Sequence, residues 1–186
     1  MSELRFLFLL SSARRNGNAE TLARHAARHL PSNIKQEWLR HTDLPLPPFE
    51  DIRNSEGGDV YPAPKGHART LLEATLTASD IVFVAPVYWY GVPTAAKLYL
   101  DHWSGWMRVP NLEFKPRMAG KTMWAITIVS DADHSVADPL TGTLKLSADY
   151  MQMRWAGALI GYGNKPGDVL SDKPSVERAE KFFVAA

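Results

Sequence analysis

The chain has 186 residues, of which 45% are apolar and 22% charged, as is usual for one globular domain. A formal net charge of +1 offers no basic field of the kind that binds nucleic acid or a membrane surface. The lack of cysteine excludes disulfides, thiolate metal ligands and cysteine nucleophiles. We therefore expect a single domain over residues 1–186.

The first ten residues, M-S-E-L-R-F-L-F-L-L, contain a short apolar run. They show neither a basic leader nor a small-residue cleavage site, so we expect no signal peptide. No stretch approaches the roughly 20 apolar residues that a membrane helix needs. These features predict a cytoplasmic protein that binds neither nucleic acid nor membrane.

Five short segments are predicted to be strands. Four of them are almost continuously apolar, which is typical of parallel strands that helices cover on both faces. These four are Phe6–Leu10, Ile81–Ala85, Met123–Val129 and Ala156–Ile160. The fifth, at residues 34–39, alternates polar and apolar residues and suits an edge strand with one solvent-facing side.

Helices are predicted between and after these strands, because apolar residues recur there at helical spacing. They are Ala19–Leu30, Gly66–Ala78, Pro93–Trp103, Leu140–Met153 and Ser175–Ala186. Strands that alternate with helices in this way predict an α/β fold with a parallel sheet and right-handed crossovers.

Two segments have no clear period. Residues 41–65 are rich in proline and acidic residues and exceed the usual connection length, so we expect a long surface loop. Within it, Leu44, Leu46 and Phe49 are available to cover another part of the protein. Residues 104–120 are predicted to be irregular as well, with exposed aromatic side chains.

The loop after the first strand reads S-S-A-R-R-N-G-N-A-E-T-L-A, residues 11–23, and leads into a helix. A helix N-terminus has unpaired N–H groups and a partial positive charge, so it suits an anion such as phosphate. The sequence matches neither the dinucleotide pattern G-x-G-x-x-G nor the P-loop. Alternatively, Asn16 or Asn18 only caps the helix and the serines only turn the chain.

The loop after the second apolar strand reads A-P-V-Y-W-Y-G-V-P-T, residues 85–94. In a parallel sheet it would lie near the first loop, beyond the carboxyl ends of the strands. Aromatic faces there would suit a flat heteroaromatic ring, so the two loops together predict a mononucleotide, with flavin the leading candidate. The alternative is core packing combined with a subunit contact, where tyrosine and tryptophan are common.

The loop after the third apolar strand, S-D-A-D-H-S-V-A-D, imitates the start of a calcium loop. Val136 and Gly142 replace the glycine and the glutamate that such a loop needs, so we expect no metal here. His134 is predicted to be a solvated loop residue, within reach of a substrate or flavin edge. His25 and His29 lie one helical turn apart without an evident third ligand, and we expect a solvated helix face.

Three pieces of the chain resemble the flavodoxin-like NAD(P)H-dependent FMN reductase and quinone or azo reductase superfamily. They are the first loop after its strand, residues 80–101 (D-I-V-F-V-A-P-V-Y-W-Y-G-V-P-T-A-A-K-L-Y-L-D) and residues 120–130 (G-K-T-M-W-A-I-T-I-V-S). The resemblance implies a three-layer flavodoxin-like sandwich whose five-stranded parallel sheet has the order 2-1-3-4-5, with helices on both faces. It also implies FMN as cofactor and NADPH or NADH as electron donor.

The resemblance also implies the residues that bind FMN. Around the phosphate it places Ser12, Arg14, Asn18, Ala19 and Glu20, with Arg14 alternatively on a phosphate of the nicotinamide cofactor. Along the isoalloxazine it places Pro86, Val87, Tyr88, Trp89 and Tyr90, and at the pyrimidine edge Ser130 and Asp131. Two departures from the family are Ala19, where many members have threonine or serine, and the absence of a glycine pair in the third loop.

The implied activity is a ping-pong oxidoreductase. NADPH or NADH would reduce the flavin and leave, and a quinone, azo dye, nitroaromatic or free flavin would then enter the same place. We expect no side chain to act as nucleophile or acid, because the cofactor supplies the chemistry. The alternatives are a flavodoxin-type electron carrier, which the net charge of +1 disfavours, and a flavin-less partner-binding domain of the same fold.

The resemblance further implies a homodimer or homotetramer, because sites in this family are often completed by a second subunit. We expect residues 103–112 and the 41–65 loop at that interface.

Overall fold

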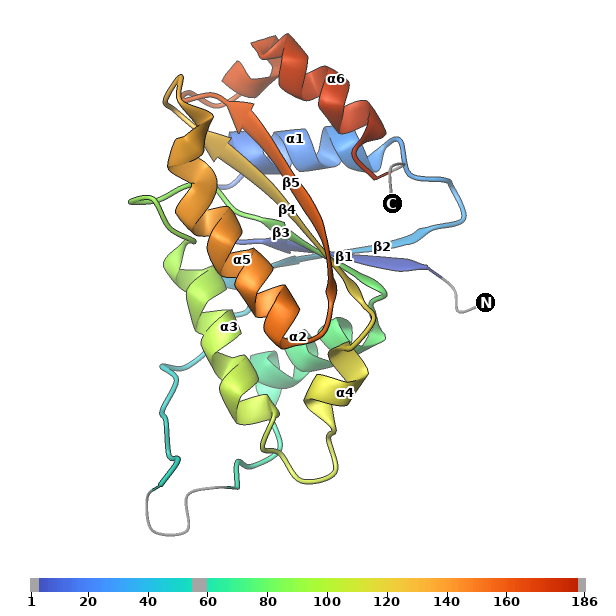
Figure 1. Cartoon of the computed structure of the whole chain (residues 1–186), viewed down its shortest axis with the longest axis vertical. Helices are drawn as coiled ribbons and strands as arrows, with labels where there is room; N and C mark the ends of the chain where they lie inside the picture. Colours follow the sequence, from blue (N-terminus) through green and yellow to red (C-terminus); the bar gives the residue numbers. More distant parts are fainter. Residues whose placement is uncertain (1–3, 55–59, 184–186) are drawn as a thin grey trace.

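The computed structural model describes residues 4–54 and 60–183. Its sheet has five parallel strands in the order β2-β1-β3-β4-β5, as the resemblance implied. Helices cover both faces of this twisted sheet (Figure 1). The α/β, flavodoxin-like prediction is therefore confirmed. Residues 55–59 of the predicted loop and 184–186 of the predicted last helix lie outside the described residues.

The strands agree with the predicted runs to within a few residues. They are β1 (Arg5–Leu10), β2 (Lys35–Arg40), β3 (Asp80–Val84), β4 (Thr122–Val129) and β5 (Arg154–Tyr162). As predicted, β2 is an edge strand, and none of its residues is fully buried. The prediction that helices fully cover the fourth apolar run was wrong. Most of β5 is only half-buried, because it forms the opposite edge and has one neighbouring strand.

The helices are α1 (Asn18–Ala27), α2 (Gly66–Thr77), α3 (Thr94–Trp106), α4 (Phe114–Met118), α5 (Asp138–Tyr150) and α6 (Lys173–Lys181). Three short 3-10 turns are η1 (His41–Asp43), η2 (His134–Ala137) and η3 (Asp168–Ser171). Helices α1 and α6 cover one face of the sheet, and α2, α3 and α5 cover the other (Figure 1). The sequence did not predict α4, whose five residues are too few to show a helical period.

Aromatic side chains fill the core on both faces of the sheet. On the α1 and α6 side, Trp124 contacts Phe183 with ring centroids 5.2 Å apart. On the other side, Trp106 and Phe114 are only 3% and 1% exposed, and their ring centroids lie 5.4 Å apart. The prediction of exposed aromatic side chains at residues 104–120 was therefore wrong, because α3 continues through Trp106 and turns that ring inward.

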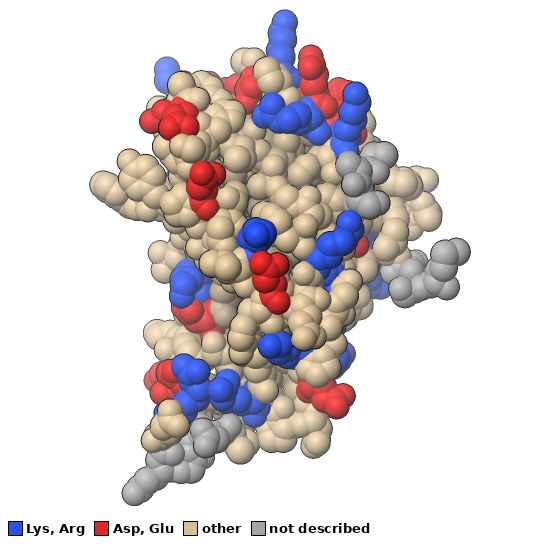
Figure 2. All heavy atoms as spheres, in the orientation of Figure 1, with Lys and Arg blue, Asp and Glu red and all other residues tan. Residues whose placement is uncertain are grey.

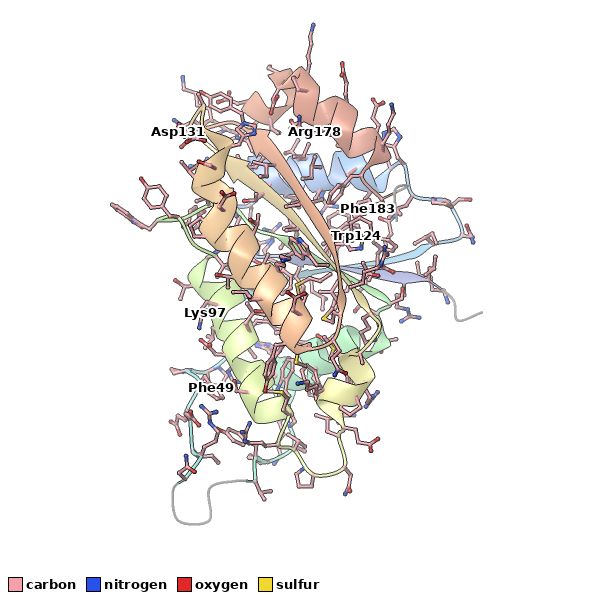
Figure 3. All side chains as sticks on the ribbon, in the orientation of Figure 1. Phe49, Lys97, Trp124, Asp131, Arg178 and Phe183 are labelled. Carbon is pink, nitrogen blue, oxygen red and sulfur yellow. The ribbon has the colours of Figure 1, made fainter. Side chains whose placement is uncertain are left out.

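The long loop after β2 covers part of the core, as predicted. Leu44 and Leu46 pack against the cluster on the α3 side. Phe49 stacks on Tyr61 with centroids 6.1 Å apart, above a hollow of about 660 Å³ that Trp106 also lines. In Figure 3, Phe49 lies at the opposite end of α3 from Lys97. This hollow is therefore separate from the carboxyl edge of the sheet.

The surface agrees with the small net charge. Figure 2 shows basic and acidic side chains interspersed over the visible face. Across the described residues, no helix is long and apolar enough to cross a bilayer.

Candidate functional site

Four loops meet at the carboxyl edge of the sheet. Strand β1 lies between β2 and β3, so the chain leaves β1 toward one side and later returns on the other. The strand order therefore reverses at β1 and β3, which is where ligands bind in open parallel sheets. Strands β1, β3, β4 and β5 all have their carboxyl ends at this edge, and the loops that follow them lie there.

The loop after β1 presents a hydroxyl and a helix N-terminus. The Ser12 hydroxyl accepts the Arg14 backbone N–H at 3.0 Å and lies 3.4 Å from the Tyr88 hydroxyl. Helix α1 begins after Gly17, which makes no side-chain cap. The N–H groups of a first helical turn lack intrahelical partners and favour an anion. Exposed Arg14 lines the same hollow and adds a positive charge.

Asn18 lines this hollow, but its amide group is already bonded. Its Nδ2 donates to the Lys165 carbonyl at 2.9 Å, and its Oδ1 accepts the Gly167 N–H at 2.8 Å. A Cβ at Gly163 would lie only 2.7 Å from that Nδ2 atom. The side chain of Asn18 therefore fastens the loop after β5, and its contribution to a phosphate is left to its backbone.

The side chain of Glu20 does not line the place that the resemblance implied. It lines neither hollow of the site and is only 5% exposed. Its carboxylate accepts Arg40 Nη2 at 2.6 Å, Arg24 Nη2 at 2.8 Å and the Asn16 backbone N–H at 3.2 Å. Burial opposes ionisation, but the two arginines prevail and hold the pKa of Glu20 below its usual value. The Glu20 side chain therefore supports the loop after β1 through these contacts and does not line the hollows.

The loop after β3 is a tight turn with two exposed aromatic rings. Tyr88 and Gly91 exchange backbone hydrogen bonds at 3.2 and 3.0 Å. Between them, Trp89 and Tyr90 have φ of 48° and 63°, a left-handed conformation that bulky residues rarely adopt. Trp89 is 96% exposed and Tyr90 60%. Val87 anchors the turn by donating its N–H to the Ile128 carbonyl at 3.2 Å.

The loop after β4 carries two successive Asx turns. The Asp131 carboxylate accepts the Asp133 N–H, and the Asp133 carboxylate accepts the Ser135 N–H, both at 2.9 Å. Hydrogen bonds from Ser135 lower the pKa of Asp133 below its ordinary value. Figure 3 places Asp131 at the upper end of α5, on the side of the aromatic turn. The predicted solvated state of His134 is only partly met, because the ring is half-buried.

Two adjoining hollows run along these loops. One, of about 160 Å³, is lined by Ser12, Arg14, Gly17, Asn18, Ala19, Pro86, Val87, Tyr88, Ile128, Ser130, Gly163 and Asn164. The other, of about 240 Å³, is lined by Val87, Trp89, Tyr90, Val129, Ser130, Asp131 and Val136. They share Val87 and Ser130, and together they fall within the roughly 300–1,000 Å³ typical of small-molecule sites.

The structure thus brings eleven of the twelve predicted site residues together, and only Glu20 lies outside. Sequence reasoning missed the loop after β5, which supplies Gly163 and Asn164. The segment G-Y-G-N-K-P-G, residues 161–167, was a usable turn signal just after a predicted strand.

The sequence matches the family model of NADPH-dependent FMN reductase over residues 4–164. The chain belongs to this family. It is an FMN-dependent NAD(P)H oxidoreductase, and the matched residues include all four loops up to Asn164. The donor set fits FMN, since a helix N-terminus, Ser12 and Arg14 lie beside one hollow while apolar and aromatic side chains line the other.

Individual relatives agree with the family. A protein of Bacillus subtilis (strain 168) named "Putative NAD(P)H-dependent FMN-containing oxidoreductase YwqN" is 28% identical over 171 residues, covering 91% of each chain. The solved Trp repressor binding protein of Bacillus subtilis has a TM-score of 0.73 at 22% identity, covering 95% of this chain and 96% of its own. An FMN-dependent NADH-azoreductase from Bacillus anthracis str. Ames Ancestor, solved with FMN, has a TM-score of 0.67 at 14% identity, covering 98% and 97%. These structures support the fold.

Proposed function

We propose that the protein takes reducing equivalents from NADPH or NADH and passes them to a quinone, an azo or nitro compound, or free flavin in a ping-pong sequence. The observation that carries this proposal is the pair of adjoining hollows, one with a phosphate-type lining and one with an aromatic lining. When bound there, FMN supplies the hydride chemistry. The protein itself would bind the cofactor, orient it toward the substrate and shield the reacting atoms from water.

The phosphate end of the site is assigned to the loop after β1. The first-turn N–H groups of α1, the Ser12 hydroxyl and Arg14 would hold the phosphate. Ala19 lines this hollow without a hydroxyl, so the backbone carries more of the binding there.

The ring end is assigned to the loops after β3 and β4. Pro86, Val87 and Tyr88 would orient one side of the ring, and Ser130 and Asp131 would approach its polar edge. The larger of the two hollows lies beside Trp89 and Tyr90, which leaves room for a flat donor or acceptor in turn. One shared place for both substrates is the physical reason for a ping-pong sequence.

We also propose a homodimer or homotetramer, with the aromatic turn at the interface. Trp103 and Trp106, previously expected there, are buried in their own subunit. The rings of Trp89 and Tyr90 are largely exposed. They belong to the loop between β3 and α3, which extends from one side of the molecule in Figure 1. A second subunit over these rings would exclude water from the reacting face.

The test is steady-state kinetics with the flavin-loaded protein, varying NADPH or NADH at several fixed concentrations of menadione. Parallel double-reciprocal lines are expected for a ping-pong sequence, and intersecting lines would contradict it. An azo dye, a nitroaromatic and free FMN, assayed in parallel, rank the acceptor classes. Flavin that bleaches with neither pyridine nucleotide under anaerobic conditions would contradict the proposed donor.

A further inference from the structure

Three potential metal ligands meet on the side of the molecule away from the flavin loops. His25 lies in the last turn of α1, His29 lies in the turn that follows this helix, and Glu180 comes from the last turn of α6. One ligand atom from each residue lies within 4.8 Å of the other two. The two imidazole centroids are 5.4 Å apart. The sequence suggested the histidine pair but gave no third ligand, because Glu180 is 151 positions after His29 and only the fold joins them.

The position of this cluster suits a cation. Helices α1 and α6 run side by side over one face of the sheet, and their carboxyl ends lie at the same end of the molecule (Figure 1). A helix carboxyl end carries a partial negative charge that favours cations within its last turn. The Glu180 carboxylate adds a full negative charge there.

The state of His25 is an independent indication. This residue was expected on a solvated helix face, but it is half-buried, and its Nε2 atom has no hydrogen-bond partner among the described residues. Buried polar atoms are usually satisfied, and an unsatisfied one calls for an explanation such as an ion. His29 and Glu180 are both exposed, so their side chains are free to turn toward it.

We propose that His25, His29 and Glu180 bind one zinc ion. Two imidazoles and one carboxylate form a ligand set typical of Zn²⁺, with a fourth position left for water. The nitrogen ligands disfavour Ca²⁺ and Mg²⁺, which prefer oxygen. Bonds of about 2.0–2.1 Å in a tetrahedron place ligand atoms about 3.3 Å apart. Atoms now within 4.8 Å need to close by about 1.5 Å, which side-chain rotation allows.

Zinc at this site would fasten α6 to α1. The opposite end of α1 opens the phosphate loop, so the ion would lie outside the flavin site and take no part in the reaction. The proposal is thus independent of the proposed function, and the two can fail separately.

The test uses the full-length, flavin-loaded protein without an affinity tag, after treatment with a chelator. Equilibrium dialysis against ZnCl₂ with metal analysis is expected to give one zinc per chain. At a zinc concentration of about 100 times Kd, the Tm should rise by about 5–10 °C. MgCl₂ and CaCl₂ serve as control salts and should give no such rise.

Two exposed ligands allow variants that keep the fold. His29→Ala and Glu180→Gln are each expected to weaken zinc binding about tenfold or more, and so to cut the Tm rise at the same zinc concentration to about half or less. The matched controls are Glu177→Gln, an exposed glutamate one turn earlier on α6, and His67→Ala, an exposed histidine on α2. Both should bind zinc like the unchanged protein. No zinc retained, or equal retention by Glu180→Gln, would overturn the proposal.

Discussion

Trp89 and Tyr90 combine exposure with backbone strain. Positive φ at both central positions of a two-residue turn normally selects asparagine and glycine. A bulky residue held in this region costs about 1–3 kcal/mol. Because both rings lie largely in solvent, their burial within one chain does not offset that cost. Strain of this kind is typical of positions retained for binding.

The first prediction is that replacing these two residues makes the protein more stable but less active. The double variant Trp89→Asn with Tyr90→Gly should raise the free energy of unfolding by about 1 kcal/mol, since both residues tolerate positive φ. It should also weaken FMN binding and slow acceptor reduction. Urea unfolding and fluorescence titration with FMN measure the two effects. As a control, Leu170→Asn changes an exposed apolar residue of ordinary φ and should give no gain.

The second prediction concerns the ion network behind the phosphate loop. Glu20→Gln takes from the Arg40 guanidinium, whose side chain is only 9% exposed, its close counter-charge at 2.6 Å and leaves it the Asp43 carboxylate at 4.0 Å. Loss of one partner from a buried pair costs about 3 kcal/mol, and Asn16 loses a charged acceptor in the loop. We therefore expect lower stability and weaker FMN binding together.

Urea denaturation of the apo-protein isolates the stability effect of Glu20→Gln from that of the cofactor. The matched control is Glu73→Gln, which breaks the exposed pair with Arg69 and should cost less than about 1 kcal/mol. Equal losses in the two variants would refute a special role for Glu20.

At the scale of elements, the loop after β5 and the start of α1 act as one unit. The Asn18 amide joins them through two hydrogen bonds, and Gly163 leaves the space that this amide occupies. The phosphate loop is therefore positioned by a segment about 145 residues away in the sequence.

The third prediction follows from this contact. Gly163→Ala would place a Cβ 2.7 Å from Asn18 Nδ2 and 3.0 Å from the Val169 backbone nitrogen, so one of them must move. We expect FMN affinity to fall about tenfold, as is usual when an outer supporting contact is lost. Gly142→Ala, on α5 with no atom within 4 Å of its new Cβ, should leave affinity unchanged. Isothermal titration of the apo-proteins with FMN compares the two.

Elements with a strong local pattern could be predicted from the sequence, and those defined by distant contacts could not. The apolar runs of β1, β3 and β4 and the alternation of β2 were enough to identify the strands. The same runs located the loops that line the hollows, so eleven of twelve proposed site residues lie there.

The differences between the structure and the sequence-based expectations also have physical reasons. Helix α4 is short, and its central Pro116 hides the helical period. The resemblance implied that Glu20 lies near the phosphate, but β2 brings Arg40 beside its carboxylate. Asn18 had an amide suited to phosphate, but the loop after β5 uses it. In each case the partner that decides the role comes from a distant strand or loop.

The whole molecule has a built-in dependence on pH through His41. This side chain is buried in the 3-10 turn after β2, 3.1 Å from the Ser11 hydroxyl through Nδ1 and with its ring centroid 5.1 Å from that of Tyr99. Burial lowers the pKa of His41 from 6.5 to about 4. The native protein therefore keeps this ring neutral where the unfolded chain would protonate it.

The fourth prediction is a loss of stability on acidification. Between pH 6.5 and about 4, His41 is protonated in the unfolded state but stays neutral in the native state. The free energy of unfolding therefore falls as the pH falls through this window. From about pH 7 to about pH 5 the loss from this residue should be about 2 kcal/mol.

His41→Gln keeps a polar partner for Ser11 but cannot titrate. Over the same pH range the variant should therefore lose about 2 kcal/mol less stability than the unchanged protein. His67→Gln, at an exposed histidine, is the control that should behave like the unchanged protein. Urea unfolding at the two pH values decides the matter, and parallel losses in all three proteins would show that His41 is not the residue responsible.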